Sequence, residues 1–202
     1  MNPIHDPQMT SEECLSFMQG VDFGSIFTPD LQVSHLPFLF KEDGKYAYAH
    51  FARANPQAAV IDGSACLMSF LGAHTYISTK YYVREQAVPT WNYAALTVKG
   101  VAHVQTHEEL LASLDEMLER FQPSLLSDKV TLPDEYRNQL SKGIIGVKID
   151  ITQISGKAKF GQHRSMEDQQ SVISHLLQGS EHDKQYATFV RDWLGTNRGL
   201  SV

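Results

Sequence analysis

The chain has 202 residues, of which 42% are hydrophobic and 20% are charged, as is ordinary for a soluble globular protein. This length suits a single domain, residues 1–202, with a substantial core. The net charge of −6 argues against the broad basic surface that binding to a nucleic-acid backbone normally needs. No run of residues is apolar enough to span a membrane, and the first ten residues are too polar for a signal peptide, so we expect a cytoplasmic protein without membrane contact.

The first part of the chain predicts one helix followed by strands. Thr10 and Glu13 fit a capping box, which predicts a helix over roughly residues 11–19. Asp43-Gly44 predicts a turn between two strands, and two later strands are expected to be separated near Gly72. The five expected strands cover residues 23–28, 31–40, 45–52, 64–71 and 73–78.

A long strand begins within residues 88–93, VPTWNY. One of its faces is apolar from Ala94 onward, which is typical of a strand that lines a core. The polar residues Thr90 and Asn92 lie on this same face, at its beginning. Because polar groups at the end of a buried strand must meet water or hold a partner, we expect a ligand site here.

The next part of the chain predicts a helix, a loop and a strand. Thr106 and Glu109 form a second capping box ahead of an apolar helical stripe. Pro123 and Pro133 bracket an expected loop. Residues 144–154 alternate between apolar and polar, which indicates a half-buried strand.

The C-terminal part predicts a helical appendage over about residues 165–195. Ser165 with Asp168 caps one helix, and a last helix is expected near residues 183–194. Hairpin strands with peripheral helices indicate a mainly β (α+β) fold, an antiparallel barrel with helical additions. A Rossmann fold is disfavoured because the strands do not alternate with helices and no GxGxxG follows a strand.

Cysteine and histidine spacing predicts no metal site. Cys14 and Cys66 do not form a CxxC pair, so two reduced, packed thiols are a better prediction than a disulfide, which stays open as an alternative. The nine histidines contain no HExxH motif or other close pair at ligand spacing. We therefore interpret them as scattered surface and core residues.

Residues 50–57, HFARANPQ, contain the first candidate for anion binding. Arg53 and Asn55 fall where the third strand gives way to a turn, and guanidinium donates to oxyanions such as phosphate in a fork. The alternative, which this segment alone slightly favours, is a surface Arg53 in an ion pair. His50 lies on the opposite face of the expected strand from Arg53. The two residues can share a pocket only if the strand bends after Ala52.

Other candidate residues have equally ordinary alternatives. Ser78, beside Lys80, could donate to an anion or could cap the following turn, which is the commoner role. Trp91 is more often a core aromatic than a ligand platform. His35 and Pro37 lie within one strand, and because proline cannot donate to a ladder, this strand is expected at an edge or a bulge.

Residues 157–164, KAKFGQHR, form a basic stretch after the alternating strand, and their usual interpretation is a solvated loop. No Ser-His-Asp arrangement, paired-carboxylate motif or activated-cysteine signature is present. The residues therefore assign no catalytic group.

Five segments of the chain occur in an order that resembles the PaiB family. This family is described as FMN-binding negative transcriptional regulators. The resemblance runs from about residue 10 to about residue 178. The segments are HLPFLF (35–40), HFARANPQ (50–57), G-x-H-x-Y-I-S (72–78), VPTWNY (88–93) and K-x-K-x-x-Q-x-R (157–164). The chain departs from the family pattern at Ala73, where proline is expected, and at His163, where asparagine is expected. Neither change removes a strong donor.

The resemblance implies a split β-barrel similar to pyridoxamine 5′-phosphate oxidase, with FMN bound at the interface of a homodimer. Residues 50–57, 72–80 and 89–92 would line the phosphate and ribityl side of FMN, and residues 157–164 would reach toward the flavin, from either subunit. The cofactor-binding residues that it implies are His35, Pro37, His50, Arg53, Asn55, Ser78, Lys80, Thr90, Trp91, Asn92, Lys157, Gln162 and Arg164.

Three classes of function are compatible with this resemblance. The first is a transcriptional regulator, although the acidic chain has no convincing helix-turn-helix, so direct contact with DNA is expected to be weak. The second is an FMN-dependent oxidoreductase, for which His35 and His74 are weak candidates as proton donors. The third is a flavin-binding or haem-binding sensor. Because one fold hosts many functions, the fold does not decide among them.

Overall fold

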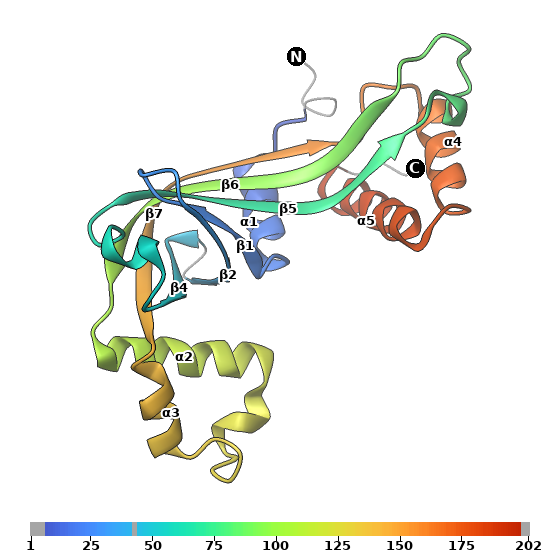
Figure 1. Cartoon of the computed structure of the whole chain (residues 1–202). Coiled ribbons are helices and arrows are strands. Elements are labelled where there is room, and N and C mark those ends of the chain that lie inside the picture. The colour runs from blue at the N-terminus through green and yellow to red at the C-terminus, as the bar shows by residue number, and fades with distance from the viewer. Residues whose placement is uncertain (1–6, 42–43, 199–202) are drawn as a thin grey trace. The chain divides into compact units, whose positions relative to one another are not determined.

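A curled antiparallel sheet dominates the computed structural model, which describes residues 7–41 and 44–198 (Figure 1). Among these residues, seven strands form one sheet in the order β2-β1-β5-β6-β7-β4-β3. The strands are β1 (Phe23–Phe27), β2 (Val33–Pro37), β3 (Leu39–Lys41), β4 (Tyr46–Ala52), β5 (Ala65–Ile77), β6 (Thr90–Val104) and β7 (Ile144–Lys159). The mainly β architecture is confirmed.

Helices accompany the sheet at its periphery. The α-helices are α1 (Ser11–Gln19), α2 (His107–Phe121), α3 (Asp134–Ser141), α4 (Met166–Leu176) and α5 (Glu181–Arg198). Short 3-10 helices are η3 (Pro56–Ala59), η4 (Thr79–Tyr81) and η5 (Pro123–Leu126). None of the helices within the described ranges is both long and apolar enough to cross a membrane.

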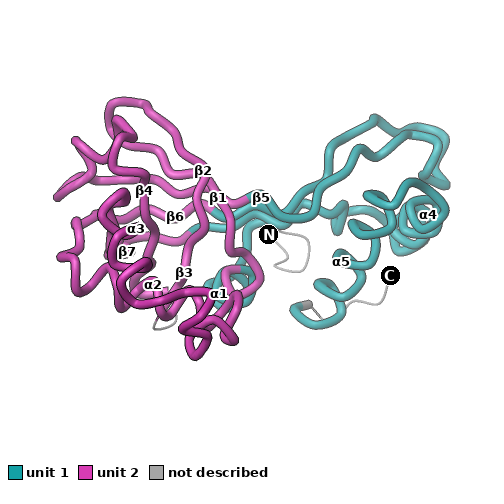
Figure 2. Tube along the Cα trace, turned by 60° about the horizontal axis from the view of Figure 1, so that its bottom comes forward, with its two compact units in different colours: residues 1–17, 71–96, 155–202 teal, residues 18–70, 97–154 magenta. Residues whose placement is uncertain are grey.

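Two compact units make up the chain (Figure 2). One unit comprises residues 1–17, 71–96 and 155–202, which we call the terminal unit. The other comprises residues 18–70 and 97–154, which we call the central unit. The long strands β5, β6 and β7 contribute residues to both. The single domain over residues 1–202 stays a prediction.

The central unit has a core of aromatic and aliphatic side chains from its strands. The Phe38 and Phe70 rings pack edge to face with their centroids 5.2 Å apart, and Phe40 packs against Phe70 at 5.3 Å. A Cβ atom at Gly24 would lie 2.5 Å from the Phe70 ring, so only glycine lets this ring lie so close to β1. Strand β4 pairs antiparallel with β7, and the buried Ala47, Ala49, Val147 and Ile149 of these strands belong to the same core.

The terminal unit is built around an aromatic cluster between α1, α5 and the end of β7. The Phe17 ring packs edge to face on Trp193 at 6.0 Å, and Phe160 packs on Phe189 at 6.0 Å. Tyr186 lies fully buried beside them. Helices α4 and α5 pack against each other, so both the strand ends and the C-terminal helices share one core.

Two expected strand boundaries are wrong. Residues 64–71 and 73–78 form the single strand β5, and Gly72 lies inside it, where a Cβ atom would come within 2.6 Å of the Phe17 ring. The strand exchanges its buried face around this glycine, which produced the apparent break. Residues 31–40 are instead two strands, β2 and β3, with the buried Phe38 between them.

The C-terminal half differs from expectation in two further places. The expected loop between Pro123 and Pro133 contains the 3-10 helix η5, and helix α3, which follows it, was not predicted. Strand β7 continues to Lys159, beyond the expected end at residue 154. The helix expected over 11–19 and both predicted free, buried thiols are confirmed. Of the expected turn, Asp43 lies outside the described residues.

Candidate functional site

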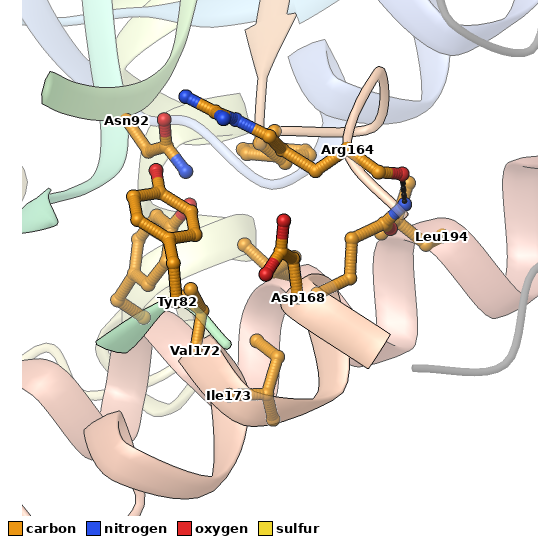
Figure 3. Close-up of a pocket in the computed structure, with 12 residues that line it drawn as sticks. Tyr82, Asn92, Arg164, Asp168, Val172, Ile173 and Leu194 are labelled. Atoms are coloured by element: carbon orange, nitrogen blue, oxygen red, sulfur yellow. Dashed lines mark hydrogen bonds between the residues drawn. The ribbon is translucent and has the colours of Figure 1, made fainter. Parts of the chain in front are cut away.

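The beginning of β6 leads into a small cavity in the terminal unit. Asn92, one of the predicted ligand residues, is only 3% exposed and lines this cavity together with Tyr82, Arg164 and Asp168 (Figure 3). Apolar side chains of α4 and α5 close its other side. The cavity measures about 10 Å³, which is about the space that one water molecule needs.

Asp168 is placed at this cavity by the first turn of α4. The Ser165 hydroxyl accepts a hydrogen bond from the Asp168 backbone N–H at 3.2 Å, so this helix begins as predicted. The Asp168 carboxylate, however, turns to the connection between β5 and β6. Its Oδ1 atom accepts hydrogen bonds from the backbone N–H groups of Val83, at 2.9 Å, and Arg84, at 3.4 Å.

Several buried polar atoms around the cavity have no partner among the described residues. Three are acceptor oxygens, namely Asn92 Oδ1, Asp168 Oδ2 and Gln169 Oε1, one is the donor Arg164 Nε, and one is the Tyr186 hydroxyl. The Arg164 guanidinium lies over the Tyr82 ring, 4.6 Å from its centroid. The space beside these groups is about that of one water molecule. It is too small for a flavin ring.

Tyr186, at the same cavity, is held in its neutral form. Burial raises the pKa of this phenol, and the Asn92 side chain offsets only part of that effect. A protonated Tyr186 is therefore a hydrogen-bonding group and not a base.

An exposed face beside this cavity carries the other residues at the start of β6. The Lys159 ammonium donates to Thr90 Oγ1 at 2.6 Å and to the Trp91 carbonyl at 3.0 Å. The Trp91 indole N–H donates to His74 Nδ1 at 3.3 Å, and the two rings stack at 5.9 Å. Trp91 is 52% exposed, so the interpretation of a core aromatic is wrong and its ring is accessible to a ligand.

The remaining predicted residues of the terminal unit have structural roles. Ser78 accepts a hydrogen bond from Lys80 N at 3.3 Å and so caps η4. This is the turn-capping role that the sequence analysis gave as the commoner of its two alternatives. Lys157 belongs to β7 and not to a loop, which corrects the interpretation of residues 157–164 as a solvated loop. The buried Gln162 donates to Ala158 O at 2.6 Å and accepts from Phe160 N at 2.8 Å, which fixes the turn after β7.

In the central unit, Arg53 closes the end of β4 against the beginning of β7. Its Nε atom donates to Lys142 O at 2.7 Å, and one terminal nitrogen donates to Ile144 O at 2.9 Å. The predicted alternative of a surface ion pair is not seen among the residues described. Asn55 caps η3 by accepting from Gln57 N at 2.9 Å, and it donates to Ser34 Oγ at 2.8 Å.

The histidines expected near a ligand lie in different surroundings. His35, on the exposed side of β2, makes a hydrogen bond of 2.9 Å with Ser25 Oγ. His50 and Pro37 line a larger cavity of the central unit, which Arg53 does not line. Burial lowers the pKa of His50, so the ring is neutral at pH 7.

The predicted cofactor residues are thus divided between the two units. In the terminal unit, the Lys159 ammonium contacts Thr90 and the carbonyl of the exposed Trp91, whereas Ser78 and Lys80 belong to the start of η4. An ammonium group suits an anionic phosphate, and an aromatic ring suits a flat ring system. In the central unit, Arg53 is exposed, and its guanidinium donates to Lys142 O and Ile144 O. This chemistry fits FMN, although the assignment of each residue stays a prediction.

Sequence reasoning missed some residues around these groups. Lys159 was expected only as part of the basic cluster with Lys157 and Arg164, and its contacts with Thr90 and the Trp91 carbonyl were not predicted. Asp168 was noted only as part of a helix cap. No local signal identifies Tyr82 or Gln169, because their positions depend on the packing of α4.

Comparison of the sequence with known proteins identifies relatives of this chain. A family model described as "Putative FMN-binding domain" matches residues 3–153. The Bacillus subtilis protein named "Protease synthase and sporulation protein PAI 2" is 37% identical over 197 residues, which cover 91% of this chain and 93% of that protein.

Solved structures show the same fold at low sequence identity. A flavocytochrome from Azotobacter vinelandii gives a TM-score of 0.59 at 12% identity, covering 83% of this chain and 77% of its own. An FAD- and haem-binding protein from Mycobacterium smegmatis gives a TM-score of 0.59 at 15% identity. The match covers 82% of this chain and 80% of that protein. The predicted split-barrel fold is confirmed.

Proposed function

Because the chain belongs to the PaiB family of FMN-binding proteins, we propose that it is a flavin-dependent regulator that acts without strong direct contact to DNA. FMN is the cofactor of this family, and bound FMN supplies reversible redox chemistry and visible absorbance. The observation that carries the proposal is the family match together with the exposed Trp91 ring and the hydroxyl and ammonium groups beside it.

The residues that would hold FMN supply two kinds of contact. Arg53, Lys80 and Lys159 are cations that attract the phosphate, and Ser78 and Thr90 are hydroxyls that can donate to it. Trp91 offers an aromatic face to the ring system. His35, Pro37, His50, Asn55, Asn92, Lys157, Gln162 and Arg164 complete the proposed set.

The proposal includes a homodimer in the cytoplasm with FMN between its subunits. Arg53, Ser78, Lys80, Thr90 and Lys159 lie at or just beyond strand ends, and none of them lines the two cavities described above. A cofactor bound there needs a second wall to exclude water, and a second copy of the chain can supply it. Large apolar side chains, including Phe23 and Leu71, are also exposed on the strands.

The charges on the helices favour a regulator that responds to flavin and does not bind DNA directly. None of the described α-helices has more lysine and arginine than aspartate and glutamate. Arg120 of α2 is paired with Asp22, and Arg191 of α5 lies 3.6 Å from Asp192. A recognition helix normally aims unpaired cations at the major groove, so these helices favour an indirect mode of regulation.

An FMN-dependent oxidoreductase is the second candidate. The two structural neighbours described above are named for flavin and haem, which are redox groups. In this chain, His74 lies between Trp91 and His182, and its ring centroid is 5.1 Å from that of His182. An absorbance spectrum of the purified protein separates flavin from haem, and turnover of reduced nicotinamide with oxygen separates an oxidoreductase from a regulator.

The experiment that tests the cofactor proposal is titration of the apoprotein with FMN and with riboflavin, followed by flavin fluorescence. A charged hydrogen bond to phosphate contributes about 1.5–3 kcal/mol, so FMN should bind about 10 to 150 times more tightly than riboflavin. Lys159→Gln should narrow this preference. The matched control is Lys129→Gln, which removes an exposed cation paired with Asp134 outside the proposed set. Equal affinity for both flavins would overturn the phosphate contacts.

A further inference from the structure

The turn between β1 and β2 holds a leucine in a backbone conformation that leucine rarely adopts. Leu31 has a φ of 64°, in the left-handed region, and among the described residues no other residue except glycine has a positive φ. Its N–H donates to Thr28 O at 3.0 Å, and the Thr28 N–H donates to Gln32 O at 3.2 Å. Hairpin loops in which a tight turn is followed by a left-handed residue usually place glycine at that residue.

The Leu31 side chain gains nothing from the fold that would explain this conformation. It is 89% exposed, so it contributes almost nothing to the hydrophobic core. A left-handed backbone is unfavourable for a residue with a Cβ atom, and such residues are found mainly at functional positions whose surroundings impose the strain. A contact outside this chain therefore explains the exposed leucine better than the fold does.

A buried glutamine fixes the shape of this turn. Gln57, which is 1% exposed, donates through Nε2 to Thr28 Oγ1 at 3.0 Å and to Gln32 O at 3.1 Å. The Thr28 hydroxyl donates to Asp30 Oδ1 at 2.6 Å. These contacts hold the residues on both sides of Leu31, so the side chain projects from a fixed support. A preorganised side chain loses little conformational entropy when it binds a partner.

Leu31 stands at the end of an exposed, apolar face of the hairpin. Phe27 pairs directly with Val33 of β2 and with Leu67 of β5, and directly paired residues point to the same face of a sheet. Phe23 shares this face, because alternate residues of a strand lie on one side. Phe23, Phe27 and Val33 are exposed, and Leu67 is half-buried. Together with Leu31, these residues form what we call the hairpin surface.

The hairpin surface suits a second copy of the same chain. Strands β1 and β2 and residues 65–69 of β5 contain no aspartate, glutamate, lysine or arginine. Two copies related by a twofold axis bring the same surface together, and an uncharged surface avoids repulsion between like charges. His35, which belongs to the proposed cofactor set, pairs with Ser25 on this face. A second copy placed here would therefore also supply the wall that bound FMN needs.

We propose that Leu31 is an anchor of the homodimer interface, where its side chain is buried against the hairpin surface of a second copy. This inference rests on the homodimer of the proposed function, and it adds the surface and the residue that stabilise the dimer. Burial of two leucines, one from each copy, offsets the cost of holding both in the left-handed conformation.

The test compares substitutions of Leu31 by sedimentation equilibrium of the full chain, with and without FMN. Leu31→Gly removes the side chain but suits the left-handed backbone, so the turn should keep its shape. We expect this variant to raise the dissociation constant of the dimer at least tenfold. Leu31→Met keeps an apolar side chain of similar size and should stay within about threefold of the natural chain.

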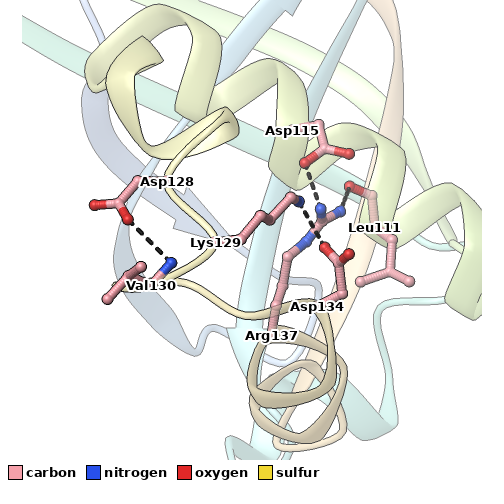
Figure 4. Close-up of polar contacts among 7 residues, drawn as sticks. All are labelled: Leu111, Asp115, Asp128, Lys129, Val130, Asp134 and Arg137. Atoms are coloured by element: carbon pink, nitrogen blue, oxygen red, sulfur yellow. Dashed lines mark hydrogen bonds and ion pairs between the residues drawn. The ribbon is translucent and has the colours of Figure 1, made fainter.

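The matched control is Val130→Gly, which removes another highly exposed apolar side chain of the central unit. Val130 is 93% exposed, and its N–H donates to Asp128 Oδ1 at 3.1 Å, so it also lies in a turn that a side chain fixes (Figure 4). It lies outside the hairpin surface. Val130→Gly should therefore leave the dissociation constant of the dimer unchanged.

Urea unfolding, at a concentration where the natural chain is monomeric, separates weaker dimerisation from misfolding. Leu31→Gly should unfold at an equal or higher urea concentration than the natural chain, because glycine adopts the left-handed backbone without strain. A lower midpoint would contradict the strain at Leu31.

An unchanged dimer in Leu31→Gly, or equal weakening by Val130→Gly, would overturn the anchor role alone. A natural chain that is monomeric at every concentration would overturn the homodimer of the proposed function as well. A dimer that depends on Leu31 but fails to bind FMN would support the anchor and contradict only the cofactor proposal.

Discussion

At the scale of single residues, Asp168 connects two parts of the terminal unit that are far apart in sequence. It starts a helix, is 1% exposed, and accepts hydrogen bonds from two consecutive backbone N–H groups, those of Val83 and Arg84. A buried carboxylate is costly unless such donors compensate it. The position of the segment between η4 and β6 therefore depends on this one side chain.

Replacing Asp168 by alanine should lower the free energy of unfolding by about 1–3 kcal/mol, because two backbone donors lose a charged acceptor. Urea denaturation measures this loss, and trypsin should cut more rapidly after Arg84 in the folded variant. Asp168→Asn keeps one acceptor oxygen and should lose less.

The matched control for this substitution is Glu167→Ala, which removes an exposed carboxylate from the same first turn of α4. It tests whether the effect comes only from the charge at the start of the helix. If Glu167→Ala and Asp168→Ala were equally destabilised, or if cleavage after Arg84 did not change, the anchoring role would be contradicted.

At the scale of elements, sequence alternation predicted β6 well because its two faces meet different surroundings. Every second residue from Asn92 to Ala102 is buried, as the pattern indicates. The same reasoning failed for β5. Its buried positions are Cys66, Met68 and Phe70 before Gly72 but Thr75 and Ile77 after it, so one period does not describe the whole strand.

Helix α3 shows another limit of local patterns. Its two large apolar residues, Tyr136 and Leu140, are 51% and 55% exposed, and its N-cap, Pro133, makes no side-chain hydrogen bond. Neither an apolar stripe nor a capping signal therefore marks it in the sequence. Its contact with α2 depends on Arg137, whose pairing with Asp115 is set by tertiary structure.

The candidate site was predictable where it depends on strand parity and not where it depends on packing. Alternation along β6 correctly placed Asn92 at the polar end of a buried face. Exposure of Trp91 was not predicted, because its stacking on His74 requires the neighbouring strand β5. Asp168 accepts hydrogen bonds from the backbone N–H groups of Val83 and Arg84, which are 85 and 84 positions earlier in the sequence. No rule based on local spacing predicts a contact over such a separation.

At the scale of the whole molecule, we expect a homodimer in solution. A monomer has a mass of 22.7 kDa, and the exposed strand residues Phe23 and Leu71, 65% and 62% exposed, are large apolar groups of the kind that interfaces cover. Sedimentation equilibrium at micromolar concentration should give twice the monomer mass. A monomer that still binds FMN tightly would contradict the shared cofactor site.

Direct binding to DNA should be weak, because the net charge of −6 repels the duplex at long range. The local cations Lys157, Lys159 and Arg164 are proposed to serve the flavin, so the same residues would have to hold two different anions. A mobility-shift assay of the pure protein on its own upstream DNA, with and without FMN, should show no specific complex at physiological salt. A specific complex that survives excess competitor DNA would restore direct repression, and its dependence on FMN would show whether the flavin and the DNA compete for these cations.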